Sequence, residues 1–85
     1  MPIISTFLGI SVYIQYNEHN PPHFHAKYGK YKISITITDG LITGSFPKRA
    51  LKLVLEWYEL HVNELLEDWE LAEKHKPLKK IKPLE

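Results

Sequence analysis

Three of the five histidines of the chain fall within a span of seven residues, at His19, His23 and His25. Two prolines, Pro21 and Pro22, separate the first histidine from the other two. Imidazole is the side chain whose unperturbed pKa lies nearest neutrality, and it is the commonest metal ligand in proteins. Proton transfer and metal binding are therefore the two kinds of chemistry that this segment predicts.

A metal site is the first interpretation of these histidines. On a β-strand, His23 and His25 would place both imidazoles on one face, because side chains two residues apart point to the same side. Phe24 would then lie on the opposite face, in the core. With His19 as the third ligand, the pair would form a first shell for zinc or another divalent metal that prefers imidazole. The reserve ligands of this hypothesis are Glu18 and His61.

Two other interpretations stay open. In a metal-free ribonuclease, His23 and His25 would be the catalytic pair, one removing the ribose hydroxyl proton while the other protonates the leaving oxygen. In a purely structural role, the histidines would bind neighbouring backbone groups. The basic side chains available to neutralise a phosphate are Lys27, Lys30 and Arg49.

A second feature is the run Pro47-Lys48-Arg49, at the expected start of a helix. Cations are disfavoured at this end of a helix, because the free N–H groups already carry partial positive charge. Together with those N–H groups, Lys48 and Arg49 predict an anion-binding site for a phosphate or a carboxylate. The alternative is that both side chains simply extend into solvent.

Composition excludes several classes of protein. The chain has 85 residues and no cysteine, so disulfides, thiolate metal sites and cysteine nucleophiles are ruled out. It contains no P-loop, nucleophile elbow or dinucleotide-binding fingerprint. We find no secretory leader and no apolar run long enough for a membrane span, and therefore expect a cytoplasmic protein without a membrane partner. The length predicts a single domain over residues 1–85.

The net charge of +1 hides an uneven distribution. An acidic block without lysine or arginine runs from Glu56 to Glu73, and a basic block follows from Lys74 to Lys82. This polarity favours a protein partner, either a second copy of the chain that matches its own two ends or another protein with patches of both signs. The alternative is that both blocks are solvated faces. With so small a net charge, any affinity for nucleic acid is expected to be weak.

The first half of the chain alternates as β-strands do. Apolar side chains occupy every second position, β-branched residues are frequent, and an Asp39-Gly40 pair is typical of a tight turn between two strands. We therefore expect three or four antiparallel strands with one apolar face. They are predicted over residues 10–16, 23–28, 31–38 and 41–45.

The second half has the periodicity of a helix. Apolar side chains recur at spacings of three and four over residues 51–72, and Pro77 ends the pattern. A straight helix over residues 47–74 would be about 40 Å long, and would overhang so small a domain. We expect either a bend near residues 61–63, with Asn63 capping a second helix, or a far half that packs on a partner.

These elements predict an α+β fold. A three- to four-stranded antiparallel sheet is followed by one long or kinked C-terminal helix, or by two helices, packed on one face of the sheet. An extended basic tail follows the helical part.

The residues quoted above resemble a small bacterial family, the domain of unknown function 4160. The resemblance covers essentially the whole chain, and its most distinctive part is the Pro-Pro-His-Phe-His string at residues 21–25. It implies no particular activity. It does imply short stand-alone proteins that are often encoded beside another small protein, an arrangement similar to a toxin–antitoxin pair. The segments that carry it are residues 19–26, 47–51, 56–57, 61, 64–66, 69–70 and 76–81.

The function predicted first is therefore a small cytoplasmic protein-interaction or regulatory module, one half of a toxin–antitoxin-like pair. Its partner would be a second copy of the chain or a small protein encoded beside it. The alternatives are a histidine-rich metal-binding domain and a small metal-free ribonuclease that uses His23 and His25. The sequence leaves open whether the protein is an enzyme.

Overall fold

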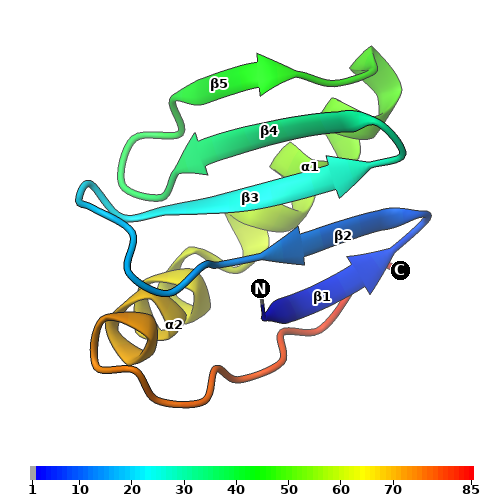
Figure 1. Ribbon diagram of the computed structural model, residues 1–85. Coiled ribbons are helices and arrows are strands. Elements are labelled where there is room, and N and C mark those ends of the chain that lie inside the picture. The colour runs from blue at the N-terminus through cyan, green and yellow to red at the C-terminus, as the bar shows by residue number, and fades with distance from the viewer. Residues whose placement is uncertain (1) are drawn as a thin grey trace.

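A computed structural model describes residues 2–85 and shows five antiparallel strands followed by two helices (Figure 1). Each strand pairs with the next one along the chain, in the order β1-β2-β3-β4-β5. The predicted α+β class and the antiparallel sheet are confirmed. The elements are β1 (Ile3–Phe7), β2 (Ile10–Tyr13), β3 (His23–Tyr28), β4 (Tyr31–Thr36), β5 (Ile42–Ser45), α1 (Lys48–Leu60) and α2 (Val62–Glu73).

Strand β1 is the element that the sequence pattern does not predict, so the expected three to four strands were one or two too few. Its burial does not alternate: Ile4, Ser5 and Phe7 are buried, while Ile3 and Thr6 are exposed. The pairing of β1 with β2 shifts register between Ile3 and Ser5. Such a bulge breaks the alternation of faces, and with it the period-two signal on which the prediction depended.

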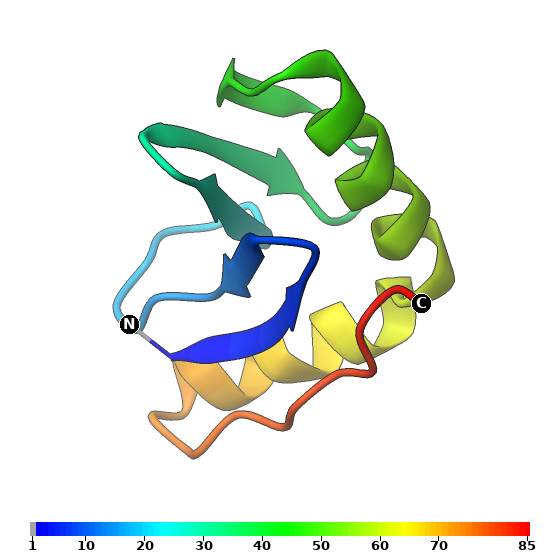
Figure 2. The same cartoon turned by 90° about the vertical axis from the view of Figure 1, so that its right-hand side faces the viewer.

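Both helices cover the same face of the sheet (Figure 2), and the core lies between these two layers. The alternation predicted for residues 31–38 is confirmed, since Ile33 and Ile35 in β4 and Ile37 just after it are all buried. The ring of Trp57 on α1 is fully buried, and its centroid lies 5.8 Å from that of Phe24 on β3. Aromatic packing of this kind fixes α1 against the face of β3 opposite the histidines.

The helical half bends at His61, the residue between α1 and α2. The radius of gyration is 11.6 Å, so a straight helix would have overhung the sheet, and the bend lets both helices reach one core. The prediction that Asn63 caps the second helix is wrong, because α2 begins at Val62 and Asn63 already lies in its first turn. Neither helix of the described chain is long and apolar enough to cross a membrane.

The chain after α2 forms neither helix nor strand and returns along β1 (Figures 1 and 2). Ile81 is buried, and its N–H donates to the carbonyl oxygen of Ile4 at 2.8 Å. The tail therefore contributes to the core and lies against the outer edge of β1. Its other anchors are hydrogen bonds from Tyr16 Oη to Lys76 O (2.9 Å), from Lys79 N–H to Asp68 Oδ1 (2.9 Å) and from Trp57 Nε1 to Lys82 O (2.9 Å).

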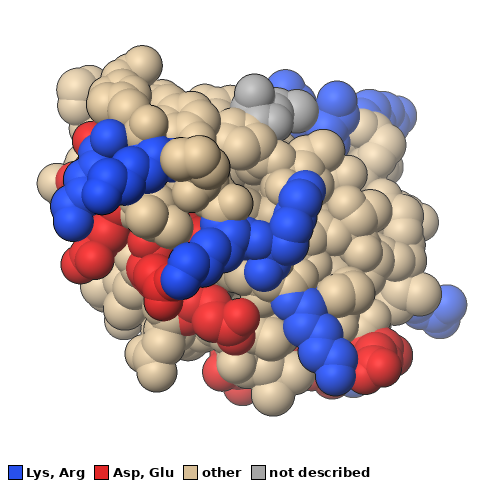
Figure 3. Space-filling model, turned by 90° about the horizontal axis from the view of Figure 1, so that it is seen from below, with Lys and Arg blue, Asp and Glu red and all other residues tan. Residues whose placement is uncertain are grey.

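The acidic and basic blocks lie next to each other. Figure 3 shows lysine and arginine side chains beside aspartate and glutamate on the face seen from below. Lys79 Nζ lies 2.5 Å from Glu67 Oε1, which brings the tail against α2. The two blocks therefore partly neutralise each other within the chain.

Candidate metal centre

The His-x-His pair lies at the start of β3, where pairing with neighbouring strands keeps the backbone extended. His25 lies opposite Tyr13 on β2 and opposite Ser34 on β4. Phe24 is fully buried in the core, so its two neighbours point to the other face of the sheet. The structure thus places both imidazoles on the face away from Phe24, as their spacing predicts.

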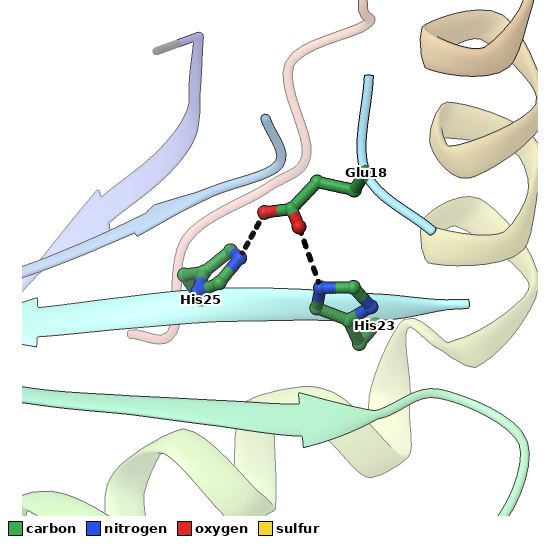
Figure 4. A group of neighbouring side chains, drawn as sticks. All are labelled: Glu18, His23 and His25. Atoms are coloured by element: carbon green, nitrogen blue, oxygen red, sulfur yellow. Dashed lines mark hydrogen bonds and ion pairs between the residues drawn. The ribbon is translucent and has the colours of Figure 1, made fainter. Parts of the chain in front are cut away.

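Glu18 meets both imidazoles from the loop that joins β2 to β3 (Figure 4). Its Oε1 lies 2.7 Å from His25 Nε2, and its Oε2 lies 3.3 Å from His23 Nε2. The loop turns at Asn17, which has a φ of +64°. Asparagine is among the residues that best tolerate this left-handed conformation, so the turn that delivers Glu18 has a local cause in the sequence.

The three side chains form a donor group suited to a cation. One ligand atom from each of Glu18, His23 and His25 lies within 4.8 Å of the others. Two donors bound to one tetrahedral ion at about 2.1 Å stand about 3.4 Å apart. The 3.3 Å between Glu18 and His23 is close to this separation, whereas the 2.7 Å between Glu18 and His25 is that of a hydrogen bond, which an ion would lengthen. The exposed fractions of the side chains are 22% for Glu18, 19% for His23 and 21% for His25. The group is therefore half-buried but still reachable from solvent.

The hydrogen bonds of His23 determine what its ring can bind. His23 Nδ1 lies 2.8 Å from the carbonyl oxygen of Pro21. A carbonyl oxygen can only accept, so Nδ1 carries a hydrogen. The Nε2 of a neutral His23 would then present a lone pair to the carboxylate of Glu18, and the two would repel. A metal cation bound between the two would relieve this repulsion.

Aromatic side chains hold the two imidazoles in place. The ring of Tyr13 stacks on His25, with centroids 5.1 Å apart and planes 12° apart. Trp69, on α2, packs on His23 with a centroid distance of 5.1 Å. Burial raises the pKa of Tyr13, and the negative charge of Glu18 raises it further, so this phenol stays neutral. The rings are thus oriented before any ligand arrives.

The other histidines of the chain do not join this group. His19 is exposed, and Glu18, its neighbour in the sequence, takes the third position that was expected for His19. His61 Nδ1 instead lies 2.6 Å from Glu64 Oε1. No periodicity in the sequence indicates which side chain of an irregular loop turns inward, and only the proximity of Glu18 to the His-x-His pair pointed to it.

Lys48 and Arg49, the predicted anion-binding pair, are both exposed in the first turn of α1. They line different hollows: Arg49 lies beside Leu8 and Tyr28, whereas Lys48 lies beside Leu51. The structure therefore does not gather the two charges around one hollow, and the anion site stays a prediction.

A hollow of about 210 Å³ adjoins Glu18 on the side of α2. Trp69, which packs on His23, forms part of its wall. The hollow leaves room for water or a small polar molecule beside the donor group. Its lining residues are Gln15, Asn17, Glu18, Trp69, Ala72, Glu73 and His75.

Comparison with known proteins gives a match that covers most of the chain, including the donor group. A family model described as Domain of unknown function (DUF4160) matches residues 9–70. This range includes the donor group and strands β2 to β5, whereas residues 76–81, which were expected to share the resemblance, lie outside it. No curated protein and no solved structure matches the chain. Because the match spans well over half of the sequence, the chain belongs to the DUF4160 family.

Proposed function

We propose that the chain is a divalent-metal-binding domain whose centre consists of Glu18, His23 and His25. The observation that carries this proposal is the convergence of three ligand atoms within 4.8 Å on one face of the sheet. Two imidazoles and one carboxylate form the donor set of metal sites that keep further positions open for water or substrate. Zinc, or another divalent ion that prefers imidazole, fits this set.

The surroundings of the group support the same proposal. A cation would relieve the repulsion between His23 Nε2 and Glu18 while the Pro21 carbonyl keeps the Nδ1 hydrogen. Metal-binding histidines commonly donate their second N–H to a backbone carbonyl in this way. The hollow beside Glu18 would give water or a small ligand access to the ion.

A metal-free ribonuclease receives less support from the geometry. General acid–base catalysis by His23 and His25 needs a free nitrogen on each ring. His23 uses Nδ1 on the Pro21 carbonyl and Nε2 on Glu18, so neither of its nitrogens is free to move a substrate proton. A metal ion would keep the hydrogen bond between His23 Nδ1 and the Pro21 carbonyl and would stand between Glu18 and the two rings, whereas acid–base catalysis needs the ring nitrogens free for substrate.

One argument for the protein-interaction module, the function predicted first from the sequence, no longer holds. An overlong apolar helix had favoured a partner, but the bend at His61 lets α1 and α2 bury their apolar stripes in the chain's own core. A proposal of protein–protein interaction must therefore depend on another surface, and the outer side of α1 is the one that supports it.

Untagged protein tests the metal centre by elemental analysis and by thermal melting with added zinc, nickel or copper. A ligand present at about 100 times its Kd stabilises the folded state by about 2.7 kcal/mol, which for a domain of this size raises Tm by roughly 10–20 °C. We expect a shift of this order for the wild type, and its loss in Glu18→Gln and His25→Ala.

His19→Ala is the matched control, because it removes a neighbouring imidazole that lies outside the group. It should keep the full metal-dependent shift. The proposal fails if no added metal moves the wild-type Tm, or if His25→Ala responds to metal as the wild type does.

A further inference from the structure

The outer side of α1 carries its charges in an order that opposes the helix dipole. Lys48 and Lys52 lie toward its start, Glu56 and Glu59 toward its end, and all four are exposed. The first turn contains no acidic residue and the last turn no basic one. The start of a helix carries partial positive charge and its end partial negative charge, so each pair lies near the helix end of its own sign.

No compensation comes from the rest of the described chain. Among residues 2–85, none of these four side chains takes part in an ion pair. Lys48 and Lys52 are four positions apart, and Glu56 and Glu59 are three apart, so each pair of like charges also repels across one turn. Lys52 and Glu56, also four positions apart, carry opposite charges, but with the lysine first this is the weaker order for an attraction. The arrangement is therefore unfavourable on balance in the isolated chain.

An apolar centre lies between the two charged pairs. Leu51 and Leu55 are half-buried, and together with the charged side chains they line a groove of about 480 Å³ on α1. The six residues recur at spacings that place them on one side of the helix. This side faces away from the sheet, and in Figure 2 no other element covers it. We call it the α1 stripe, formed by Lys48, Leu51, Lys52, Leu55, Glu56 and Glu59.

We propose that the α1 stripe is an interface between two copies of the chain, related by a two-fold axis with their α1 helices antiparallel. Antiparallel packing that sets Leu51 against Leu55 of the second copy also brings Lys52 near Glu56 of that copy. By the same register Lys48 approaches Glu59 of the second copy, and symmetry makes every contact occur twice.

The dipoles favour this arrangement as well. In the antiparallel pair, the lysines of each copy lie beside the end of the other helix, where the partial charge is negative. The glutamates lie beside the other helix's positive start. The charge order that is unfavourable within one chain thus becomes complementary between two, whereas a uniformly acidic or basic partner would match only half of the stripe.

One helix face is a small contact, so we expect a weak dimer that dissociates on dilution and at high salt. Sedimentation equilibrium or light scattering over a range of protein concentrations measures it. In Lys52→Glu, and separately in Glu56→Lys, each dimer acquires two contacts between like charges. Each variant should therefore dimerise about tenfold more weakly than the wild type.

Recombining the variants gives the decisive measurement. A mixture of Lys52→Glu with Glu56→Lys restores opposite charges at both contacts, so the two proteins should form a heterodimer although each alone is largely monomeric. The double variant K52E/E56K should dimerise with itself again. Lys32→Glu, an exposed charge reversal on β4, is the matched control and should dimerise as the wild type does.

Three results would overturn the proposal. They are a wild type that stays monomeric at low salt and high concentration, a dimer that neither single variant weakens, and singly weakened variants that mixing fails to restore. Circular dichroism shows whether each variant is folded, and the mixing experiment remains decisive for folded variants. The α1 stripe and the histidine group lie on opposite sides of the sheet, so failure of one proposal leaves the other standing.

Discussion

The histidine rings have different hydrogen-bond partners, and the partner of each ring determines whether that ring can serve as a metal ligand. His61, between α1 and α2, is bound to a carboxylate in the first turn of α2, that of Glu64. His23 and His25 instead share one carboxylate, Glu18, which arrives from a loop. A shared carboxylate with a second imidazole beside it is a donor set for a cation, whereas a single histidine–glutamate pair is an ordinary helix contact.

Asp68 is a second residue whose surroundings have a measurable consequence. It is 1% exposed; its Oδ1 accepts the Lys79 N–H, and within the described chain its buried Oδ2 has no hydrogen-bond partner. Burial raises the pKa of Asp68, the Lys79 N–H partly opposes this, and the charges of Glu67 and Glu64 add to the rise. The folded state therefore holds the Asp68 proton more tightly than the unfolded state does.

The sign of the pH effect follows from this raised pKa. The stability contributed by protonated Asp68 is present below the usual aspartate pKa and is lost as the pH rises through the raised value. Asp68→Asn keeps the oxygen acceptor and removes the charge. In thermal melts between about pH 4 and about pH 8, the stability of the variant relative to the wild type should therefore increase as the pH rises. Near neutrality its free energy of unfolding should be higher by about 1 kcal/mol.

Asp39→Asn, at an exposed aspartate in the β4–β5 turn, is the matched control for a charge removed at the surface. If the difference in Tm between Asp68→Asn and the wild type stays constant with pH, the buried carboxyl does not contribute in this way.

At the scale of elements, the pairing of β4 with β5 requires a glycine within β5. Gly44 lies opposite Ile33 and has a φ of +109°. A Cβ added there would lie 2.5 Å from the carbonyl oxygen of Lys32 and 3.1 Å from the Cα of Ile33. The two strands can therefore pair in this register only with a residue that lacks a side chain and adopts positive φ.

Gly44→Ala should lower the free energy of unfolding by about 2–3 kcal/mol, since it adds a backbone clash to a strained conformation. Gly29→Ala is the control: its φ is +59°, and nothing lies within 4 Å of an added Cβ. Gly29→Ala should lower the free energy of unfolding by only about 1 kcal/mol. Urea unfolding measures both, and equal losses would show that the close approach of β4 does not matter.

Strand β5 also differs from β1 in its exposure. All four residues of β5 are exposed, and β4 is its only neighbour in the described sheet. The outer edge of β1 is met by the C-terminal tail, through the Ile81 hydrogen bond. One edge of the sheet is thus covered by the chain itself and the other is left open, which makes the tail part of the fold.

At the scale of the whole molecule, the tail closes the core. Ile81 is 3% exposed although its segment has no regular secondary structure. Ile81→Ala should lower the free energy of unfolding by about 3 kcal/mol, through lost burial and the cavity left behind. The control is Leu60→Ala, a similar truncation at a side chain that is 67% exposed. Urea unfolding should detect almost no change for the control, and a comparably small loss for Ile81→Ala would mean that the tail is not held as described.

The sequence by itself determined those features that have a local cause. Alternation along residues 31–38 determined that Ile33, Ile35 and Ile37 face the core, because successive side chains of a strand point to opposite sides. The same geometry put His23 and His25 on one face. The length of the apolar helical stripe, set against the size of the domain, indicated either a bend near residues 61–63 or a partner for the far half, and the structure has the bend.

Only the tertiary structure decided the features that join distant or irregular segments. Whether Glu18 or His19 completes the donor group depends on the path of a loop, which has no repeat to interpret. The place of β1 depends on a bulge and on contact with Ile81, far away at the other end of the chain. Local periodicity reports which way a side chain faces relative to its neighbours, but the free energy that brings separate segments together comes from burial and hydrogen bonds that form only when the whole chain has folded.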